Sequence, residues 1–433
     1  MTHPSGAGSP SANGTPASSR YLIGELDLPL VRPESSEALA RYVREAAATG
    51  TAVYPVGGGT RNDLGRCPDK PGTAVDLRSL AQVIDYPSAD MTITVQTGIT
   101  IAKLAEILAA KGQRLPVDSH DPANETLGGL IAANGSGPRR FGHGTMRDYV
   151  IGIKYLTDET EEAKAGGRVV KNVAGYDLCK LHTGALGTLG IITEVTLKLR
   201  PLAEARAVVL VSCPGGKLEE LAGLIHDSRT RPVSVDALNA GACSFLTGRG
   251  VPLAALAAPT AGNWLVGVGF EENRGATDWQ KSELVKELKG YSTAQLTEGQ
   301  EEGWWTALAA LCPGTSGTVM KWTCLPSKMA LILNQVQALA EVHAVVAHLG
   351  NGIARVHTAS STEVAKAAEI SAKLRKLALE AGGNLVLERA GPAFRRTIPV
   401  WGEPRPDHDL ARRIHRELDP HGLFNPGRFL PGI

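Results

Sequence analysis

The stretch Thr51-Ala52-Val53-Tyr54-Pro55-Val56-Gly57-Gly58-Gly59-Thr60 decides the fold expected for this chain. It begins as an apolar strand and runs directly into three consecutive glycines. Because glycine has no side chain, such a loop can turn successive N–H groups toward one point, which makes a site for an anion such as a diphosphate. We expect a positive φ at Gly58 in this loop. A tight loop without a ligand would have the same sequence, so the loop alone leaves both interpretations open.

Further fragments of similar character follow before residue 200. Glycine makes up 49 of the 433 residues, and the excess is concentrated in this part of the chain. The fragments are, in order, Pro116-Val117-Asp118, residues 126–137 (Thr-Leu-Gly-Gly-Leu-Ile-Ala-Ala-Asn-Gly-Ser-Gly), Arg140-Phe141-Gly142, Arg147-Asp148, residues 170–177 (Val-Lys-Asn-Val-Ala-Gly-Tyr-Asp) and residues 184–192. Many backbone segments in this part must therefore approach another group closely.

Composition and motifs exclude several function classes. The 45 Lys and Arg residues nearly balance the 44 Asp and Glu residues, which is unlike the basic footprint of a nucleic-acid-binding protein. No apolar run approaches the roughly 20 residues of a membrane-spanning helix. The G-x-G-x-x-G, phosphate-loop and G-x-S-x-G motifs do not occur, which argues against a Rossmann site, an NTPase and an α/β-hydrolase. The six cysteines include no C-x-x-C pair, so we expect free thiols and no zinc knuckle or cysteine-bound iron–sulfur cluster.

Hydrophobic periodicity predicts strands and helices in both halves of the chain. Ser35 or Ser36 is expected to cap the first helix, which Gly50 ends, and Thr100 to cap a second helix, which Gly112 ends. Strands are expected at residues 51–56, 73–77, 92–96, 149–156, 190–199, 208–213, 264–270, 342–347, 353–358 and 384–388. Further helices are expected at 218–228, 278–289, 362–379 and 409–418. The second half lacks strict strand–helix alternation, so it predicts an antiparallel sheet covered by helices on one face.

Taken in order, and with the closing Asn425-Pro426-Gly427, the fragments resemble the FAD-binding domain of the vanillyl-alcohol oxidase family, also called the PCMH-type fold, over about residues 25–200. The resemblance implies an α+β fold: a two-subdomain FAD-binding domain, an α+β cap domain with an antiparallel sheet, and a C-terminal segment that returns to the FAD domain. The expected boundaries are a disordered tail at 1–20, the FAD-binding domain at 21–202, the cap or substrate domain at 203–400 and the returning segment at 401–433.

The resemblance also implies which residues hold FAD. N–H groups of the glycine loop and of the Gly128 region would bind the diphosphate, and Gly190-Ile191-Ile192 would lie by the adenine and ribose. The full set of expected cofactor-binding residues is Pro55, Val56, Gly57, Gly58, Gly59, Thr60, Pro116, Asp118, Thr126, Leu127, Gly128, Gly129, Asn134, Gly135, Gly187, Gly190, Ile191, Ile192 and Asn425. Some members attach FAD through a histidine just after the glycine loop. Thr60 stands there in this chain, so we expect non-covalent FAD.

Within the family, residues 170–177 and 418–428 most closely resemble the smaller FAD-binding subunit of bacterial glycolate oxidase. This implies a small 2-hydroxy acid as substrate, and a second FAD-binding subunit and an iron–sulfur subunit as partners. Neither a nucleic-acid partner nor a transmembrane segment is expected. The expected location is cytoplasmic, with attachment to the inner face of the membrane through the partners as an alternative.

Related D-2-hydroxyacid dehydrogenases carry a His-x-Gly-Asp-Gly-Asn-x-His metal motif in the cap domain. This chain has His348-Leu349-Gly350-Asn351-Gly352-Ile353-Ala354-Arg355-Val356-His357, without the aspartate and with the second histidine two residues late. On an extended segment His348 and His357 would point to opposite faces. Glu388 is followed by Arg389, where the relatives continue into a histidine ligand. We therefore expect no bound metal.

Flavin-dependent oxidation of a 2-hydroxy acid needs a base for the hydroxyl proton and a cation for the carboxylate. We expect His348 to be the base, and Arg355, Arg389 or Arg428 to form the carboxylate fork; a purely structural role is the alternative for each. Several functions stay open: a subunit that oxidises glycolate or D-lactate and passes electrons to a partner, a stand-alone dehydrogenase, and a non-catalytic flavin-bearing subunit. An aromatic alcohol or a sugar as substrate is disfavoured, because that resemblance is confined to the FAD domain.

Overall fold

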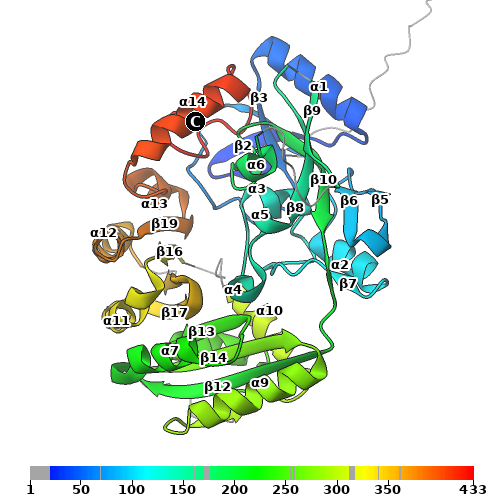
Figure 1. The fold of residues 1–433 in the computed structure, drawn as a ribbon. Coiled ribbons are helices and arrows are strands. Elements are labelled where there is room, and N and C mark those ends of the chain that lie inside the picture. The colour runs from blue at the N-terminus through cyan, green and yellow to red at the C-terminus, as the bar shows by residue number, and fades with distance from the viewer. Residues whose placement is uncertain are drawn as a thin grey trace, which may run out of the picture.

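The computed structural model describes residues 20–68, 70–159, 161–168, 176–253, 256, 259–311, 317–339, 341–359 and 362–433. These residues form a first α+β part with two sheets and a second part built on one large antiparallel sheet (Figure 1). The C-terminal helix lies back beside the first part, as Figure 1 shows. The expected α+β fold with a cap and a returning C-terminal segment is confirmed.

The first subdomain is a four-stranded sheet with one long helix. Its strands are β1 (Arg20–Ile23), β2 (Leu26–Val31), β4 (Gly72–Asp76) and β3 (Ala52–Val56), in this spatial order. Helix α1 (Ser36–Thr49) begins where the Ser35 hydroxyl accepts a hydrogen bond from the Ala38 N–H at 3.2 Å, and it ends at Gly50 with φ 65°. Ser35, rather than Ser36, is therefore the cap. Strand β3 is an edge strand that leads straight into the glycine loop.

The second subdomain is a five-stranded antiparallel sheet. Its strands lie in the order β5 (Val83–Asp85), β6 (Thr92–Gln96), β10 (Ile191–Lys198), β8 (Val150–Leu156) and β9 (Glu162–Gly166). Helix α2 (Ile101–Ala109) is capped by Thr100, as predicted. The short helices are α3 (Leu127–Ala132), α4 (Arg140–His143), α5 (Met146–Tyr149) and α6 (Leu178–His182). A small ladder of β7 (Gln113–Arg114) and β11 (Arg200–Pro201) leads out of this subdomain.

The cap is one eight-stranded antiparallel sheet. Its strands lie in the order β15 (Thr293–Gln295), β12 (Ala205–Pro214), β14 (Asn263–Glu272), β13 (Ser234–Leu238), β17 (Val342–His348), β18 (Ile353–Thr358), β16 (Val319–Thr323) and β19 (Asn384–Arg389). One face packs against α7 (Leu218–Asp227), α9 (Arg274–Glu287), α11 (Pro326–Gln337), α12 (Val364–Glu380) and α13 (Pro392–Thr397).

Two further helices cover part of the opposite face of the cap sheet, which the sequence did not predict. They are α8 (Ala240–Gly248) and α10 (Glu301–Leu311). Glycines in β14 make room for the indoles of α10, because a Cβ on Gly267 would lie 2.1 Å from the Trp304 ring and one on Gly269 would lie 2.6 Å from the Trp305 ring. The remainder of this face, on β16, β18 and β19, is left to face the first part of the chain.

The C-terminal segment completes the first subdomain. After α14 (Pro406–Leu418), the chain runs along the open edge of β3: the Val53 N–H donates to the Leu423 carbonyl at 2.8 Å, and the Asn425 N–H donates to the Val53 carbonyl at 2.9 Å. The buried carboxylate of Asp419 accepts the N–H groups of Leu423 and Phe424, which fixes this turn. The edge strand is thereby covered.

A buried ionic cluster joins the two parts of the molecule. Glu271 of β14 is fully buried and receives Arg114 at 2.7 Å, His143 at 2.7 Å and Arg139 at 3.0 Å from the first part. Arg206 of β12 also lies 3.0 Å from Glu271. Burial would raise the pKa of Glu271, but the hydrogen bond from His143 and the charges of Arg139 and Arg114 outweigh it and hold that pKa well below its usual range. The cluster therefore fixes how the cap faces the first part.

Replacing Glu271 by Gln is expected to lower the free energy of unfolding by about 3 to 5 kcal/mol, because the buried cations would lose the charge that compensates them. Urea unfolding followed by tryptophan fluorescence measures this change. Glu272→Gln, one residue along and exposed, is the matched control and should unfold like the wild type. An unchanged unfolding midpoint for Glu271→Gln would show that the cluster does not stabilise the fold.

The low pKa of Glu271 predicts a pH dependence as well. In the unfolded chain this carboxyl returns to its ordinary pKa of 4.5. Its stabilising contribution is therefore complete above that pH and is lost as the pH falls below it. Between about pH 5 and about pH 3, the free energy of unfolding should fall more steeply for the wild type than for Glu271→Gln. Parallel curves for the two proteins would contradict this assignment.

Candidate flavin and substrate cavity

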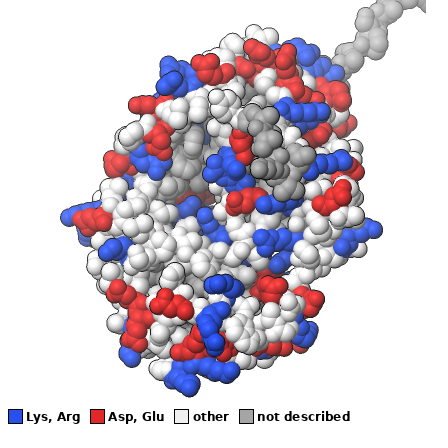
Figure 2. Space-filling model, viewed as in Figure 1, with Lys and Arg blue, Asp and Glu red and all other residues white. Residues whose placement is uncertain are grey.

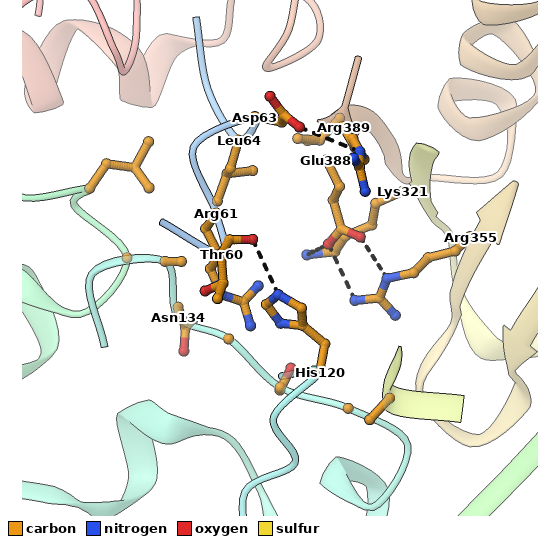
Figure 3. A pocket seen from close by; sticks show the side chains of 18 of the residues that line it. Thr60, Arg61, Asp63, Leu64, His120, Asn134, Lys321, Arg355, Glu388 and Arg389 are labelled. Atoms are coloured by element: carbon orange, nitrogen blue, oxygen red, sulfur yellow. Dashed lines mark hydrogen bonds and ion pairs between the residues drawn. The ribbon is translucent and has the colours of Figure 1, made fainter. Parts of the chain in front are cut away.

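A cavity of about 550 Å³ lies where the cap sheet faces the first part of the chain (Figure 3). One wall includes residues 59–64 and 133–137 with Thr183, Gly184 and Leu186, and the other includes side chains on β16, β18 and β19. Seen from the side drawn in Figure 1, the surface mixes acidic and basic residues, with several Lys or Arg side chains gathered at the hollow near the centre (Figure 2). The sequence therefore brings the glycine-rich loops and the cap residues to one place.

The glycine loop supplies a row of backbone donors. Within the described residues, the N–H groups of residues 58–61 donate no hydrogen bond. Gly59 has the positive φ, at 73°, so the expectation of a positive φ at Gly58 is wrong. Gly58 is required for a different reason: a Cβ there would lie 1.8 Å from the Asn124 carbonyl oxygen. Close packing against the 124–126 segment thus holds the loop so that its N–H groups stay available for an anion.

The second glycine-rich stretch contributes residues 133–137 to the same wall as the glycine loop. Thr126 caps α3 by accepting the Gly129 N–H, and Asn134, two residues after the end of the helix, has φ 46°. The Asn134 side-chain oxygen is buried and has no hydrogen-bond partner. An unsatisfied buried amide and a row of free N–H groups in one cavity fit a polar cofactor with a diphosphate.

The expected cofactor-binding residues divide into two groups. Those that line the cavity are Gly59, Thr60, Asp118, Asn134 and Gly135. The others lie outside the cavity lining: Pro55, Val56, Gly57, Gly58, Pro116, Thr126, Leu127, Gly128, Gly129, Gly187, Gly190, Ile191, Ile192 and Asn425. Asn425, for example, donates from its side chain to the Leu186 carbonyl at 2.6 Å. Residues 170–175 of the predicted motif lie outside the described residues.

The cap wall carries a coupled set of charges from three strands. Arg355 of β18 donates to both carboxylate oxygens of Glu388 on β19, at 2.6 and 3.2 Å. Lys321 of β16 lies 3.8 Å from Glu388 and points toward the middle of the cavity (Figure 3). Burial would raise the pKa of Glu388, but Arg355 and Lys321 outweigh it and lower the pKa to about 2. Burial, Arg355 and Arg140 lower the pKa of Lys321, and Glu388 opposes them.

His348 lies behind Arg355 and does not line the cavity. It is 1% exposed; its Nδ1 lies 2.5 Å from Asp236 and its Nε2 lies 3.1 Å from Arg355. Because both ring nitrogens are engaged, this placement favours a positioning role over the role of base expected from the sequence. Arg428 is also committed elsewhere, since it donates to the carbonyls of Asn62, Leu64 and Arg66. Arg389 does line the cavity, 3.4 Å from Asp63.

The two histidines of the altered motif share a face, contrary to the prediction. The chain turns at residues 349–352, so His348 ends β17 and His357 lies on β18, and the pairing of His348 with Ile353 puts both on one side. His348 lies opposite Ile353, and Ile353 is four residues before His357 on β18. The two histidines are therefore about 13 Å apart along the strand. Among the described residues, no three His, Cys, Asp or Glu side chains are grouped to hold a metal ion.

Sequence reasoning missed several residues that line the cavity, and three of them carry charge or can be protonated. Arg61 directly follows the glycine loop and is paired with the buried Glu125. His120 lies 3.2 Å from the Thr60 carbonyl, and burial and Arg61 lower its pKa. Lys321 is the third. The only sign of Lys321 in the sequence is a charged residue in the middle of an apolar strand. The sequence does not show which residues lie beside it on the neighbouring strands, so its place in the cavity could not be predicted.

Comparisons with known proteins agree with this geometry. Residues 28–166 match the FAD binding domain, and residues 242–429 match the C-terminal domain of FAD linked oxidases. The solved structure of an alkyldihydroxyacetonephosphate synthase superposes with a TM-score of 0.65 and 17% identity, covering 92% of this chain and 77% of that one. The chain therefore has the two-domain fold of FAD linked oxidases; it is an FAD-dependent oxidoreductase, and FAD is its cofactor.

Relatives with similar sequences include three named oxidoreductase chains. Glycolate oxidase subunit GlcD of Bacillus subtilis is 24% identical over 92% of this chain and 88% of that protein. Glycolate oxidase subunit GlcE of Escherichia coli is 34% identical, over 39% of this chain and 48% of that protein. A mitochondrial D-lactate dehydrogenase (cytochrome) of Arabidopsis thaliana is 25% identical over 97% of this chain and 76% of that protein. The GlcD match is the longer of the two subunit matches, so the expected smaller-subunit type is not singled out.

Gly58→Val is expected to give protein without bound FAD, because its side chain would collide with the Asn124 carbonyl and displace the donor row. The ratio of visible flavin absorbance to protein absorbance after purification is the measurement. Gly167→Ala is the control, since its Cβ would meet nothing within 4 Å and its φ is not positive. Full flavin content in a folded Gly58→Val protein would rule out this account of the loop.

FAD should be released by acid precipitation, since Thr60 cannot form the covalent link that a histidine would form at that position. The supernatant should carry the yellow colour and the precipitate should be white. Colour that stays with washed, precipitated protein would show covalent attachment.

Proposed function

We propose that this flavoenzyme oxidises a small 2-hydroxy acid, glycolate or D-lactate, to the corresponding 2-oxo acid. The observation that carries the proposal is the excess of cations around the cavity: Arg61, Arg140, Lys321, Arg355 and Arg389 line it against Asp63, Asp118 and Glu388. A substrate carboxylate would offset this excess. The relatives named as glycolate oxidase subunits and as a D-lactate dehydrogenase support the same substrate class.

In this proposal Arg389 and Arg140 bind the substrate carboxylate. Arg389 lines the cavity 3.4 Å from Asp63, and Arg140 lines it and donates to the Ser136 hydroxyl at 3.1 Å. Burial and the charge of Arg355 lower the pKa of Arg140, which means that a nearby anion would be favourable. Arg355 gives its Nε and Nη2 donors to Glu388. It therefore acts as a positioning residue that holds Glu388 beside Lys321.

Lys321 is the residue we assign as the base. Its ammonium group reaches into the cavity, and burial lowers its pKa, which favours the neutral amine that can accept a proton. FAD, when bound, supplies the acceptor for the two electrons and the hydrogen that leave C2 of the substrate. Lys321 takes the hydroxyl proton, so that the C–O single bond becomes the carbonyl of the 2-oxo acid. Asp236 and His348 support this wall from behind through Arg355.

We further propose that the electrons leave through partner subunits. The spacing of the six cysteines excludes a cysteine-bound iron–sulfur cluster in this chain, and two relatives are named as subunits. The partners would be a second FAD-binding subunit and an iron–sulfur subunit, in the cytoplasm or at the inner face of the membrane. No helix of the described residues is long and apolar enough to cross a membrane. A stand-alone dehydrogenase is the alternative.

Anaerobic stopped-flow bleaching of the flavin tests the substrate class. The isolated chain should be reduced slowly by glycolate or D-lactate, and turnover with a respiratory acceptor should require the partner subunits. Rapid turnover without partners would favour the stand-alone alternative. No reduction by either acid, with or without partners, would refute the substrate class.

Lys321→Met should slow flavin reduction at least about 10²-fold, because the hydroxyl proton loses its acceptor. In the wild type the rate should rise with pH as the amine becomes neutral, and this rise should be absent from the variant. Lys321→Arg distinguishes a base from a residue that only supplies positive charge, because a guanidinium keeps its proton. Flavin reduction in Lys321→Arg should be as slow as in Lys321→Met. Lys328→Met, at an exposed position of the same domain, is the control. Wild-type rates in Lys321→Arg would contradict the role of base.

A further inference from the structure

A second cavity, of about 560 Å³, lies between α13, α14 and residues 66–68. It is lined by Arg66, Arg395, Arg396, Arg412 and His408, and no Asp or Glu is among the described residues that line it. Trp401 lines both this cavity and the flavin cavity and so separates them. The volume of this second cavity lies in the range of small-molecule sites. Nothing in the oxidation chemistry uses this cavity.

Arg395 in the wall of this cavity has donors without acceptors. The residue is 3% exposed, and its Nη1 donates to the carbonyls of Asn62 and Gly65 at 3.4 and 3.3 Å. Its Nε and Nη2 are buried and have no hydrogen-bond partner. The nearest carboxylate oxygen, on Asp63, is 3.7 Å from Nη2. Buried charged donors are normally paired, so this side chain indicates an anionic acceptor.

The neighbouring cations leave the cavity with uncompensated positive charge. Arg396 is paired with Glu25 and Arg412 with Asp409, each at 2.6 Å. The guanidinium of Arg66, in contrast, makes no hydrogen bond or ion pair with any part of the chain that the structure describes. Burial and the charge of Arg395 lower the pKa of the adjacent Arg428 to about 10, which agrees with an excess of positive charge.

We propose that this cavity binds a small phosphate-bearing anion. Arginine forks match the oxygens of a phosphate group, and the guanidinium of Arg66 presents such a fork at this cavity. The apolar part of the lining, from Ile398, Val400 and Trp401, leaves room for an organic group attached to the phosphate. The site is independent of the proposed substrate of the oxidation.

The cavity is connected to the flavin site through Arg395. The carbonyls that Arg395 holds belong to residues 62–65, and residues 59–64 line the flavin cavity. An anion bound at Arg66 would add a negative charge beside Arg395 and so favour the position in which Arg395 holds this loop. Binding of the anion and binding of FAD should therefore support each other, because coupling between two sites is reciprocal.

Isothermal titration of the FAD-saturated protein with pyrophosphate and with ADP tests the site; saturation with FAD keeps the probes from the donor row of the flavin cavity. Pyrophosphate should bind once per chain, and Arg66→Gln should weaken it at least tenfold. Arg413→Gln, on α14 and exposed, should bind as the wild type does. Tighter binding of ADP would identify a nucleotide, and equal binding would identify the phosphate group as the determinant. No binding, unchanged affinity in Arg66→Gln, or equally tight citrate would overturn the proposal.

The coupling has its own measurement, which does not depend on enzyme activity. After dilution, FAD should leave the holoprotein several-fold more slowly when pyrophosphate is present, as followed by the recovery of flavin fluorescence. Arg66→Gln should abolish this effect while still binding FAD, because Arg66 does not line the flavin cavity. An identical release rate with and without pyrophosphate in the wild type would refute the coupling.

Discussion

The buried carboxylate of Glu271 is the contact on which the geometry of the cavity depends. It lies on the cap sheet and is surrounded by cations of the flavin-binding part, so the two parts cannot separate without exposing several mutually repelling charges. The cavity has one wall on each part. The Glu271 contact helps to hold Lys321 and Glu388 opposite the glycine loop, together with the ion pair of Arg389 with Asp63 and the hydrogen bonds from Arg395 to residues 62 and 65. The stability of the interface and the placement of the cap residues therefore both depend on this buried cluster.

Most of the scaffold follows from local signals in the sequence. The caps at Thr100 and Gly50 and the apolar strand before the glycine loop were predicted because their hydrogen bonds close within a few residues. The missed elements include the strands β13 and β16 and the helices α8, α10 and α11. Strand β13 carries a fully buried aspartate, and α10 is buried on nearly every side, so neither shows the periodicity of an amphipathic element.

The two walls of the cavity differ in how far sequence could predict them. The flavin-facing wall is made of backbone donors in continuous glycine-rich loops, so its residues could be named in advance even though only some of them line the cavity. The cap wall is made of Lys321, Arg355 and Glu388, which come from three strands and meet only through sheet register. The roles expected of His348 and Arg428 were revised because burial and carbonyl contacts are properties of tertiary packing.

The pairing of the C-terminal segment with the edge of β3 has a consequence for biosynthesis. Residues 423–425 supply hydrogen bonds to the strand that carries the glycine loop, and Arg395 and Arg428 hold the carbonyls just beyond it. Synthesis from the N-terminus makes residues 423–425 only after the whole cap. Until then the edge of β3 lacks its partner from residues 423–425, so the strand that leads into the glycine loop gains its full set of backbone hydrogen bonds only after the cap has been synthesised.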